Sequence, residues 1–192
     1  MLVSPMVVAS TQEQLSEQRQ LFSEALELIS QGRWKSLPEK HQQLADYPLY
    51  PYLVYADLIA NLRYSRRAEV ARYLGDFQGT VKAQHLRSKW LDYLARRNYW
   101  TTYIEFFNPD QASVKQQCLF QLARLNRLDK ITGLDDRAAE KESAIASALA
   151  LWNVGKSQPK ECDKLFSLLV TEKRISEQVA WQRFNKALFN HQ

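Results

Sequence analysis

Residues that commonly hold metal ions are few and scattered in this sequence. Its three histidines, His41, His85 and His191, lie far apart, without an HxxxH spacing and without a cysteine at metal-ligand distance. A protein zinc site draws three or four ligands from Cys, His, Asp or Glu side chains, usually at short spacings. The sequence therefore predicts no metal site.

Motifs that build a catalytic nucleophile or a phosphate site are also missing. The sequence contains no GxSxG, no HExxH and no glycine-rich phosphate loop, and it has only 5 Gly. Glu13, Glu17, Glu24 and Glu27 fall on an expected helix face beside Gln and Arg, where solvated carboxylates are the simpler interpretation. We therefore predict no catalytic residue and no cofactor.

Aromatic residues crowd two corners of the sequence. The first corner is bent by prolines and holds Tyr47, Tyr50, Tyr52 and Tyr55, and the second holds Tyr99, Trp100, Tyr103, Phe106 and Phe107. Such rings can stack on sugars, but they also fill gaps between short helices, with each tyrosine hydroxyl bonded to a carbonyl. The sequence favours packing and leaves sugar stacking as the alternative.

The two cysteines, Cys118 and Cys162, have no CxxC spacing, and each falls on the apolar stripe of an expected helix. Two buried free thiols would suit a reducing compartment. In an oxidising compartment they could pair, and the chain-entropy model then gives roughly 4 kcal/mol of stabilisation before any strain. The residues alone leave both alternatives open.

The composition is that of a globular helical protein. Of 192 residues, 45% are hydrophobic and 24% charged, which excludes a disordered or collagen-like chain. Few glycines and prolines, together with abundant Leu, Ala, Gln, Glu, Lys and Arg, favour helices. No run of about 18 apolar residues occurs, so we expect no membrane span.

The net charge of +5 is a weak bias towards acidic polymers. The longest basic groupings are pairs such as Arg66–Arg67 and Arg96–Arg97, which we interpret as solvated surface. Nucleic-acid binders usually cluster such residues along one face. We therefore predict no nucleic-acid partner.

Apolar residues recur at helical spacing along nearly the whole chain, which predicts an all-α fold. The expected helices cover about 12–30, 34–45, 51–63, 68–77, 81–97, 99–107, 114–125, 136–154, 159–169 and 176–190. Gly32 is expected to end the first helix, while Asn108 and the Asp135–Asp136 pair are expected to cap later ones. Short helices with short connections predict an α-solenoid of degenerate helical hairpins.

Two segments resemble a known family. They read DYPLYPYL at 46–53 and GKSQPxxCDKLF at 155–166. Both look like the N-terminal, U-shaped superhelical region of the soluble lytic murein transglycosylases of Gram-negative bacteria. Flanking residues agree, namely Glu17–Arg19, Leu94–Arg97 and Cys118 at the place of the family's first cysteine. The resemblance runs from about residue 13 to 188.

The resemblance implies a periplasmic location and a parent activity. The family cleaves the β-1,4 bond between N-acetylmuramic acid and N-acetylglucosamine without water, which leaves 1,6-anhydro ends. Its catalytic glutamate lies in a lysozyme-like C-terminal domain whose ES, GLMQ and AYNAG motifs have no counterpart here, since Glu142–Ser143 is an isolated ES pair. The resemblance therefore transfers no catalytic residue. It implies a region that scaffolds or binds peptidoglycan glycan strands beside the missing linker and catalytic domains.

The resemblance also implies a disulfide between Cys118 and Cys162, because family members pair the two matching cysteines. The periplasm is oxidising enough to keep such a bond. Between the cysteines this chain is longer than the family pattern, and we expect the extra residues within 130–141. This departure concerns the local geometry there and not the pairing.

The first residues, MLVSPMVVAST at 1–11, are expected to be a signal-peptide remnant or a disordered N-terminus, because family precursors carry a signal peptide just before the first helix. Residues 12–192 are then one superhelical domain, truncated at its C-terminal end. Two alternative functions rank below the one that the resemblance implies. They are a stand-alone helical-repeat adaptor that binds a protein partner, and a nucleic-acid-binding solenoid.

Overall fold

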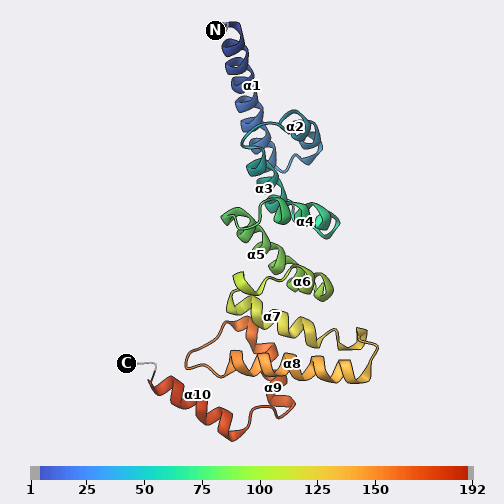
Figure 1. Cartoon of the computed structure of the whole chain (residues 1–192), viewed down its shortest axis with the longest axis vertical. Helices are drawn as coiled ribbons and strands as arrows, with labels where there is room; N and C mark the ends of the chain where they lie inside the picture. The colour runs from blue at the N-terminus through green and yellow to red at the C-terminus, as the bar shows by residue number, and fades with distance from the viewer. Residues whose placement is uncertain (1–4, 190–192) are drawn as a thin grey trace. The chain divides into compact units, whose positions relative to one another are not determined.

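The structure is a computed structural model that describes the backbone of residues 5–189 and the side chains of residues 12–189 except that of Trp34. Within that range the chain forms α-helices and short 3-10 turns and no strand (Figure 1). The all-α fold class predicted from the sequence is confirmed. The chain divides into two compact units, residues 1–90 and 91–192.

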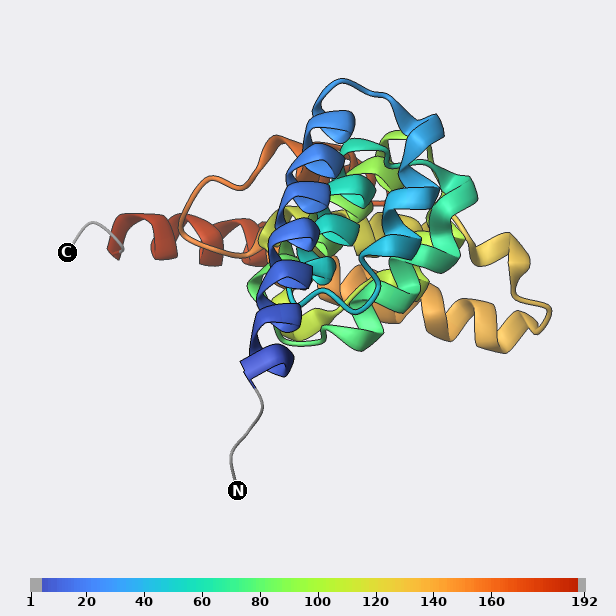
Figure 2. The same cartoon turned by 90° about the horizontal axis from the view of Figure 1, so that it is seen from above.

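The first unit is built from α1 (Pro5–Ser30), α2 (Leu37–Gln43), α3 (Tyr50–Ala60), α4 (Arg67–Asp76) and the start of α5 (Val81–Arg96). Figure 2 shows α1 beside α2 and α3. Their shared core includes the buried side chains of Ala25, Ile29, Leu37, Leu44, Tyr47 and Leu53. Gly32 follows α1 with φ 67°, a backbone conformation that suits glycine after a helix, so its predicted role is confirmed.

The second unit contains the end of α5, α6 (Trp100–Phe106), α7 (Val114–Leu125), α8 (Leu134–Trp152), α9 (Asp163–Thr171) and α10 (Glu177–Phe189). Helices α7, α8 and α9 pack against one another (Figure 1). Their core includes Cys118, Leu122, Ile145, Ala148, Cys162, Leu165 and Leu169. The stripe predicted from Cys118 and Leu122 therefore faces the interior.

Short 3-10 turns connect several helices: η1 (Trp34–Ser36), η2 (Tyr64–Arg66), η3 (Pro109–Gln111), η4 (Leu128–Lys130) and η5 (Lys160–Cys162). They explain two shifted boundaries. The helix expected from residue 34 begins at Leu37, and the helix expected from Pro159 begins at Asp163, because a 3-10 turn comes first in each case.

Two predicted helix caps are wrong. The Asn108 side chain accepts a hydrogen bond from the backbone N–H of Asp110 and caps η3, whereas α7 is capped by Ser113. The N-cap of α8 is Gly133, so Asp135 and Asp136 lie inside the first turn. At that place their carboxylates face the positive end of the helix dipole instead of bonding the free N–H groups.

The first helix also begins earlier than predicted, at Pro5 instead of residue 12, since proline is tolerated in the first turn of a helix. The interpretation of residues 1–11 as a signal-peptide remnant or a disordered terminus stays a prediction, and residues 1–4 lie outside the described part. Among the described helices, none combines the length and the apolarity needed to cross a membrane.

Candidate functional site

The aromatic corner at residues 47–55 serves mainly as packing. Tyr47 is 7% exposed, and its ring lies 5.5 Å from that of Phe22 between ring centroids. The Tyr55 hydroxyl contacts Nδ1 of His85. Tyr52, at 52% exposure, presents its ring to solvent.

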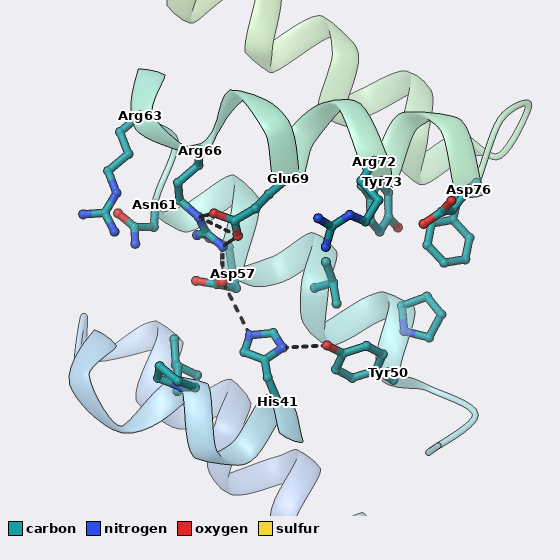
Figure 3. A pocket seen from close by; sticks show the side chains of 15 residues that line it. His41, Tyr50, Asp57, Asn61, Arg63, Arg66, Glu69, Arg72, Tyr73 and Asp76 are labelled. Atoms are coloured by element: carbon teal, nitrogen blue, oxygen red, sulfur yellow. Dashed lines mark hydrogen bonds and ion pairs between the residues drawn. The ribbon is translucent and has the colours of Figure 1, made fainter. Parts of the chain in front are cut away.

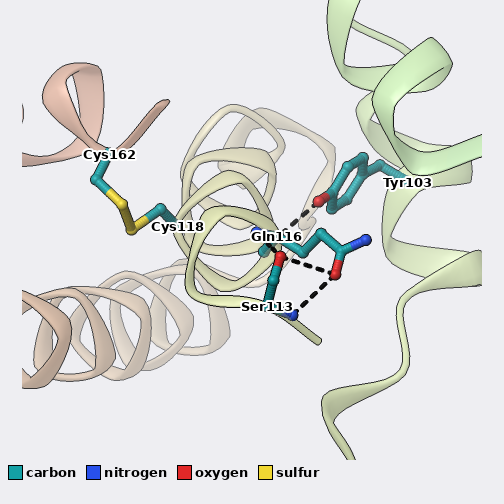
Figure 4. Close-up of a disulfide and its surroundings, with 5 residues drawn as sticks. All are labelled: Tyr103, Ser113, Gln116, Cys118 and Cys162. Atoms are coloured by element: carbon teal, nitrogen blue, oxygen red, sulfur yellow. Dashed lines mark hydrogen bonds between the residues drawn. A yellow bond between two sulfur atoms is a disulfide. The ribbon is translucent and has the colours of Figure 1, made fainter. Parts of the chain in front are cut away.

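The second aromatic corner also packs mainly inward, although Tyr99 is 38% exposed. Tyr103 is fully buried, and its hydroxyl donates a hydrogen bond of 3.1 Å to the carbonyl of Gln116 (Figure 4). Phe107 stacks on Phe120, with 3.9 Å between ring centroids. The packing interpretation of this corner is thus confirmed for Tyr103, whereas Trp100 keeps part of its surface at a pocket described below.

A pocket of about 510 Å³ opens between α2, α3 and α4 in the first unit (Figure 3). Proline rings and apolar side chains form part of its wall, and charged side chains cluster at its centre. Figure 3 shows Asn61 and Arg63 at one end of the pocket and Tyr73 and Asp76 at the other. The pocket therefore offers both apolar and polar contacts to a ligand.

A network of five charged or polar side chains lies at the centre of this pocket. The Arg66 guanidinium donates from Nη2 to Asp57 Oδ2 at 2.6 Å and to Glu69 Oε2 at 2.6 Å. His41 Nε2 lies 3.5 Å from the same Asp57 oxygen, and His41 Nδ1 lies 3.3 Å from the Tyr50 hydroxyl. The side chains of Asp57 and Arg66 are only 7% and 11% exposed, so this pair is largely shielded from water.

These contacts fix the protonation states of the pair. Burial acts to raise the pKa of Asp57, but the hydrogen bonds and charges of His41 and Arg66 outweigh it, so this pKa lies below its ordinary value. Burial likewise acts to lower the pKa of Arg66, and Glu69 and Asp57 reverse that effect. Asp57 is therefore anionic and Arg66 cationic at neutral pH.

Four polar side chains of the pocket are left for a ligand. Asn61, Arg63, Arg72 and Asp76 line the pocket and make no side-chain hydrogen bond or ion pair with other described residues. Burial raises the pKa of Tyr50, and it raises the pKa of Tyr73 to about 12, so both hydroxyls stay protonated. Amide, guanidinium and hydroxyl groups at a partly apolar wall suit the hydroxyl and N-acetyl groups of sugars.

The interpretation of the Arg66–Arg67 pair as solvated surface is wrong for Arg66. Its side chain turns inward because the buried Asp57 carboxylate needs a cation. Arg67 stays exposed, with its guanidinium carbon 5.7 Å from the Tyr64 ring centroid. Sequence reasoning missed Asp57, and the available signal was an acidic residue on an otherwise apolar helix, YPYLVYADLIA.

The remaining candidate residues lie apart from one another. His85 lies beside Tyr55, and His191 falls outside the described residues. No group of three or more Cys, His, Asp or Glu side chains suited to a metal occurs in the described part of the chain. Glu142 of the isolated ES pair accepts hydrogen bonds of 2.6 and 3.0 Å from Arg174, so its carboxylate is occupied.

The two cysteines that the resemblance pairs, Cys118 and Cys162, are joined by a disulfide with an S–S distance of 2.05 Å (Figure 4). Cys118 lies on α7 and Cys162 ends the turn η5, directly before α9. Both side chains are fully buried in the core of the second unit. The bond thus ties α7 to the start of α9 across 44 sequence positions.

Comparison with known proteins places this fold in context. No family model matches the chain. The chain is 30% identical over 156 residues to the soluble lytic murein transglycosylase of Escherichia coli strain K12, and equally to that of Salmonella typhimurium. Each match takes in 81% of this chain and 22% of the relative. The chain thus spans about a fifth of the length of these curated relatives.

Solved structures give the same result. The lytic transglycosylase Slt of Pseudomonas aeruginosa, an inactive mutant, is 30% identical with a TM-score of 0.70, and covers 87% of this chain with 25% of its own. The 70 kDa soluble lytic transglycosylase of Escherichia coli is 27% identical with a TM-score of 0.72 over 90% of this chain and 26% of its own. A similar structure of the 70 kDa enzyme contains bulgecin A. The chain therefore resembles the all-helical domain of these enzymes, in which the helices form a superhelix.

Proposed function

We propose that this chain, which resembles the helical domain of the soluble lytic murein transglycosylases, is the N-terminal, non-catalytic part of such a protein and holds glycan strands of peptidoglycan. The observation that carries the proposal is the match of 81% to 90% of this chain to about a quarter of those enzymes. The catalytic step then belongs to a domain outside this sequence.

The protonation of the central pocket supports a binding role over a catalytic one. Cleavage of a glycosidic bond needs a carboxylic acid that is protonated at working pH, which requires a raised pKa. Asp57 has the opposite shift, and its carboxylate is held by Arg66 at 2.6 Å. This side chain is suited to orienting the pocket wall and not to donating a proton.

The chemistry of the pocket supports sugar binding. Asn61, Arg63 and Arg72 offer donors with no competing ion pair among the described side chains. A net charge of +5 also attracts the acidic peptidoglycan layer. The proposed location is the periplasm, because a disulfide at Cys118 and Cys162 is stable in an oxidising compartment.

Co-sedimentation with purified peptidoglycan sacculi tests the proposal. We expect the chain to pellet with the sacculi and to release no 1,6-anhydro muropeptides, measured by mass spectrometry. Arg72→Ala should weaken the pelleting about threefold to tenfold, because it removes a charged donor from the pocket. Arg33→Ala is the matched control, since Arg33 is exposed and lies outside the pocket.

Either of two results would overturn the proposal. Release of 1,6-anhydro ends by the purified chain would show that it is itself catalytic. Failure of the chain to pellet with sacculi at low salt would remove the glycan-holding role.

A stand-alone adaptor that binds a protein partner is the alternative, and one surface favours it. Trp181, Phe184 and Leu188 on α10 are 63%, 50% and 54% exposed. Large exposed apolar side chains in a row are typical of protein interfaces. A protein partner recovered by pull-down, together with no affinity for sacculi, would favour the adaptor.

A further inference from the structure

We propose that a second pocket, in the second unit, binds a carboxylate of a short peptide attached to the glycan, with cations at its rim and an apolar floor. The choice of a muramyl peptide as the ligand rests on the proposed function. The presence of a carboxylate site rests on the geometry of the pocket alone.

Three walls surround this pocket, whose volume is about 400 Å³. The end of α5 and the start of α6 supply Arg96 and Trp100, α7 supplies Lys115 and Leu119, and η5 with the first turn of α9 supplies the third wall. All lining residues belong to the second unit. The site is therefore complete within one unit.

The charges of the lining do not cancel. Four cationic side chains, Arg96, Lys115, Lys160 and Lys164, face only two carboxylates. Both carboxylates are taken by the same Lys115, whose Nζ lies 2.9 Å from Asp92 and 3.4 Å from Glu161. Two positive charges are thus left over in a concave site.

The remaining three cations are available to a ligand. Arg96, Lys160 and Lys164 are exposed and form no ion pair within the described range. Lys164 lies in the first turn of α9, where a positive charge opposes the helix dipole. The charge of Lys164 therefore does not stabilise α9, and it is available to bind an anion.

The floor of the pocket is apolar. Leu119 and Leu122 are each 9% exposed, and the half-buried Trp100 ring packs against the same core. A site with cations at its rim and an apolar floor suits a carboxylate carried on a short aliphatic chain. Peptidoglycan carries free carboxylates on its short peptides, whereas the hydroxyl and N-acetyl groups of its sugars are uncharged.

The disulfide holds two walls of the pocket together. Cys118 lies on α7 between Lys115 and Leu122, and Cys162 lies between Lys160 and Lys164. Both cysteines are fully buried, and their bond fixes the spacing of the two backbone segments from which these lysines project. A preformed spacing lowers the entropy that binding must overcome.

Binding of muramyl dipeptide by the oxidised chain, measured by isothermal titration calorimetry, tests the proposal. This probe carries one free carboxylate, and its amidated form is the matched neutral ligand. We expect the acid to bind at least about tenfold more tightly than the amide at low salt, as a charge-assisted hydrogen bond predicts. The difference should shrink at high salt.

Lys160→Gln and Lys164→Gln should each weaken binding of the acid about threefold to tenfold and leave binding of the amide unchanged. Lys156→Gln is the matched control, because Lys156 is exposed on the same segment and lies outside the pocket. The substituted lysines are exposed and unpaired, so thermal unfolding of these variants should match that of the unsubstituted chain.

Equal affinity for the acid and the amide, or equal loss in Lys156→Gln and Lys164→Gln, would overturn the carboxylate site. No binding of the acid while sacculi still pellet would overturn this site and leave the proposed function standing. Binding of the acid without pelleting would keep the site and remove the glycan-holding role.

Discussion

Asp57 lies on α3 with its side chain 7% exposed, between the Arg66 guanidinium and the His41 ring. A carboxylate at such a place is costly unless cations and donors compensate for the lost water. Arg66 provides the cation at 2.6 Å and is itself held by Glu69. Asp57 and Arg66 therefore depend on each other, and the loss of either leaves a largely buried charge without its main partner.

Asp57→Asn is expected to lower the free energy of unfolding by about 3 kcal/mol, because it leaves the Arg66 guanidinium without its buried anion. Urea denaturation at neutral pH measures the loss. Asp46→Asn is the control: Asp46 is exposed and unpaired, so its change should stay within about 0.5 kcal/mol. Equal effects of both substitutions would contradict the buried pair.

The same pair predicts a dependence of stability on pH. The pKa of Asp57 lies below its ordinary value of 3.8, so the folded chain holds this carboxylate deprotonated more firmly than the unfolded chain does. Its stabilising contribution is complete above about pH 5 and is lost as the pH falls through the folded pKa. The stability difference between the unsubstituted chain and Asp57→Asn should therefore shrink in acid. A difference independent of pH would refute the charge-based explanation.

Sequence reasoning did not predict this pair, for a physical reason. Asp57 and Arg66 are separated by the end of α3 and the turn η2, so neither helical periodicity nor a motif connects them. An Arg–Arg pair read from sequence usually lies on the surface. Only the folded path of the chain shows that Arg66 turns inward while Arg67 stays outside.

At the scale of the elements, local signals predicted most helices and failed at their starts. Periodicity places α7 at 114–125 in both the prediction and the structure, because its apolar side chains meet one core. The cap of α7 was missed, since the Asn108–Pro109 signal belongs to the turn η3. Ser113 caps α7 together with Gln116, a capping box that the letters S-x-x-Q already contain (Figure 4).

Ser113→Ala is expected to lower the free energy of unfolding by about 1 kcal/mol, the usual cost of losing an N-cap side chain. Thermal or urea unfolding measures the loss. Ser157→Ala, at an exposed serine without a cap role, should have almost no effect. An unchanged stability of Ser113→Ala would show that the capping box contributes little to α7.

The link between α7 and η5 makes the second unit sensitive to reduction. Removal of the Cys118–Cys162 bond frees a loop of 44 sequence positions in the unfolded chain, for which the chain-entropy model gives about 4 kcal/mol. We expect dithiothreitol to lower the melting temperature and to weaken binding at the adjacent pocket. A Cys118→Ala/Cys162→Ala variant should not respond to dithiothreitol. A melting temperature unchanged by complete reduction would contradict the role of the bond.

At the scale of the whole chain, pattern and composition predicted an all-α fold but no activity. The resemblance rested on two segments, 46–53 and 155–166. The first forms the start of α3, and the second forms the connection into α9. Proline fixes the entry into α3, and Cys162 anchors α9 to α7. Such segments identify a fold, whereas binding sites depend on side chains that only folding brings together.

The last helix, α10, is held by polar contacts along one edge. Lys186 donates a hydrogen bond of 2.8 Å to the carbonyl of Asn153, and the Arg183 guanidinium carbon lies 4.5 Å from the Trp152 ring centroid. Its apolar face, formed by Trp181, Phe184 and Leu188 at helical spacing, remains exposed. These large apolar side chains are exposed to water and are not packed in a core, which favours association.

We therefore expect the purified chain to self-associate at high concentration, with an average mass in light scattering above that of a 22.4 kDa monomer. Trp181→Gln/Phe184→Gln should restore the monomer, because it removes the two stacked rings, whose centroids lie 5.3 Å apart. Val170→Gln on α9 is the control, since Val170 is 63% exposed but lies outside this face. A monodisperse monomer of the unsubstituted chain would show that the apolar face of α10 does not drive association. Association that persists in the double variant would place the contact elsewhere on the surface.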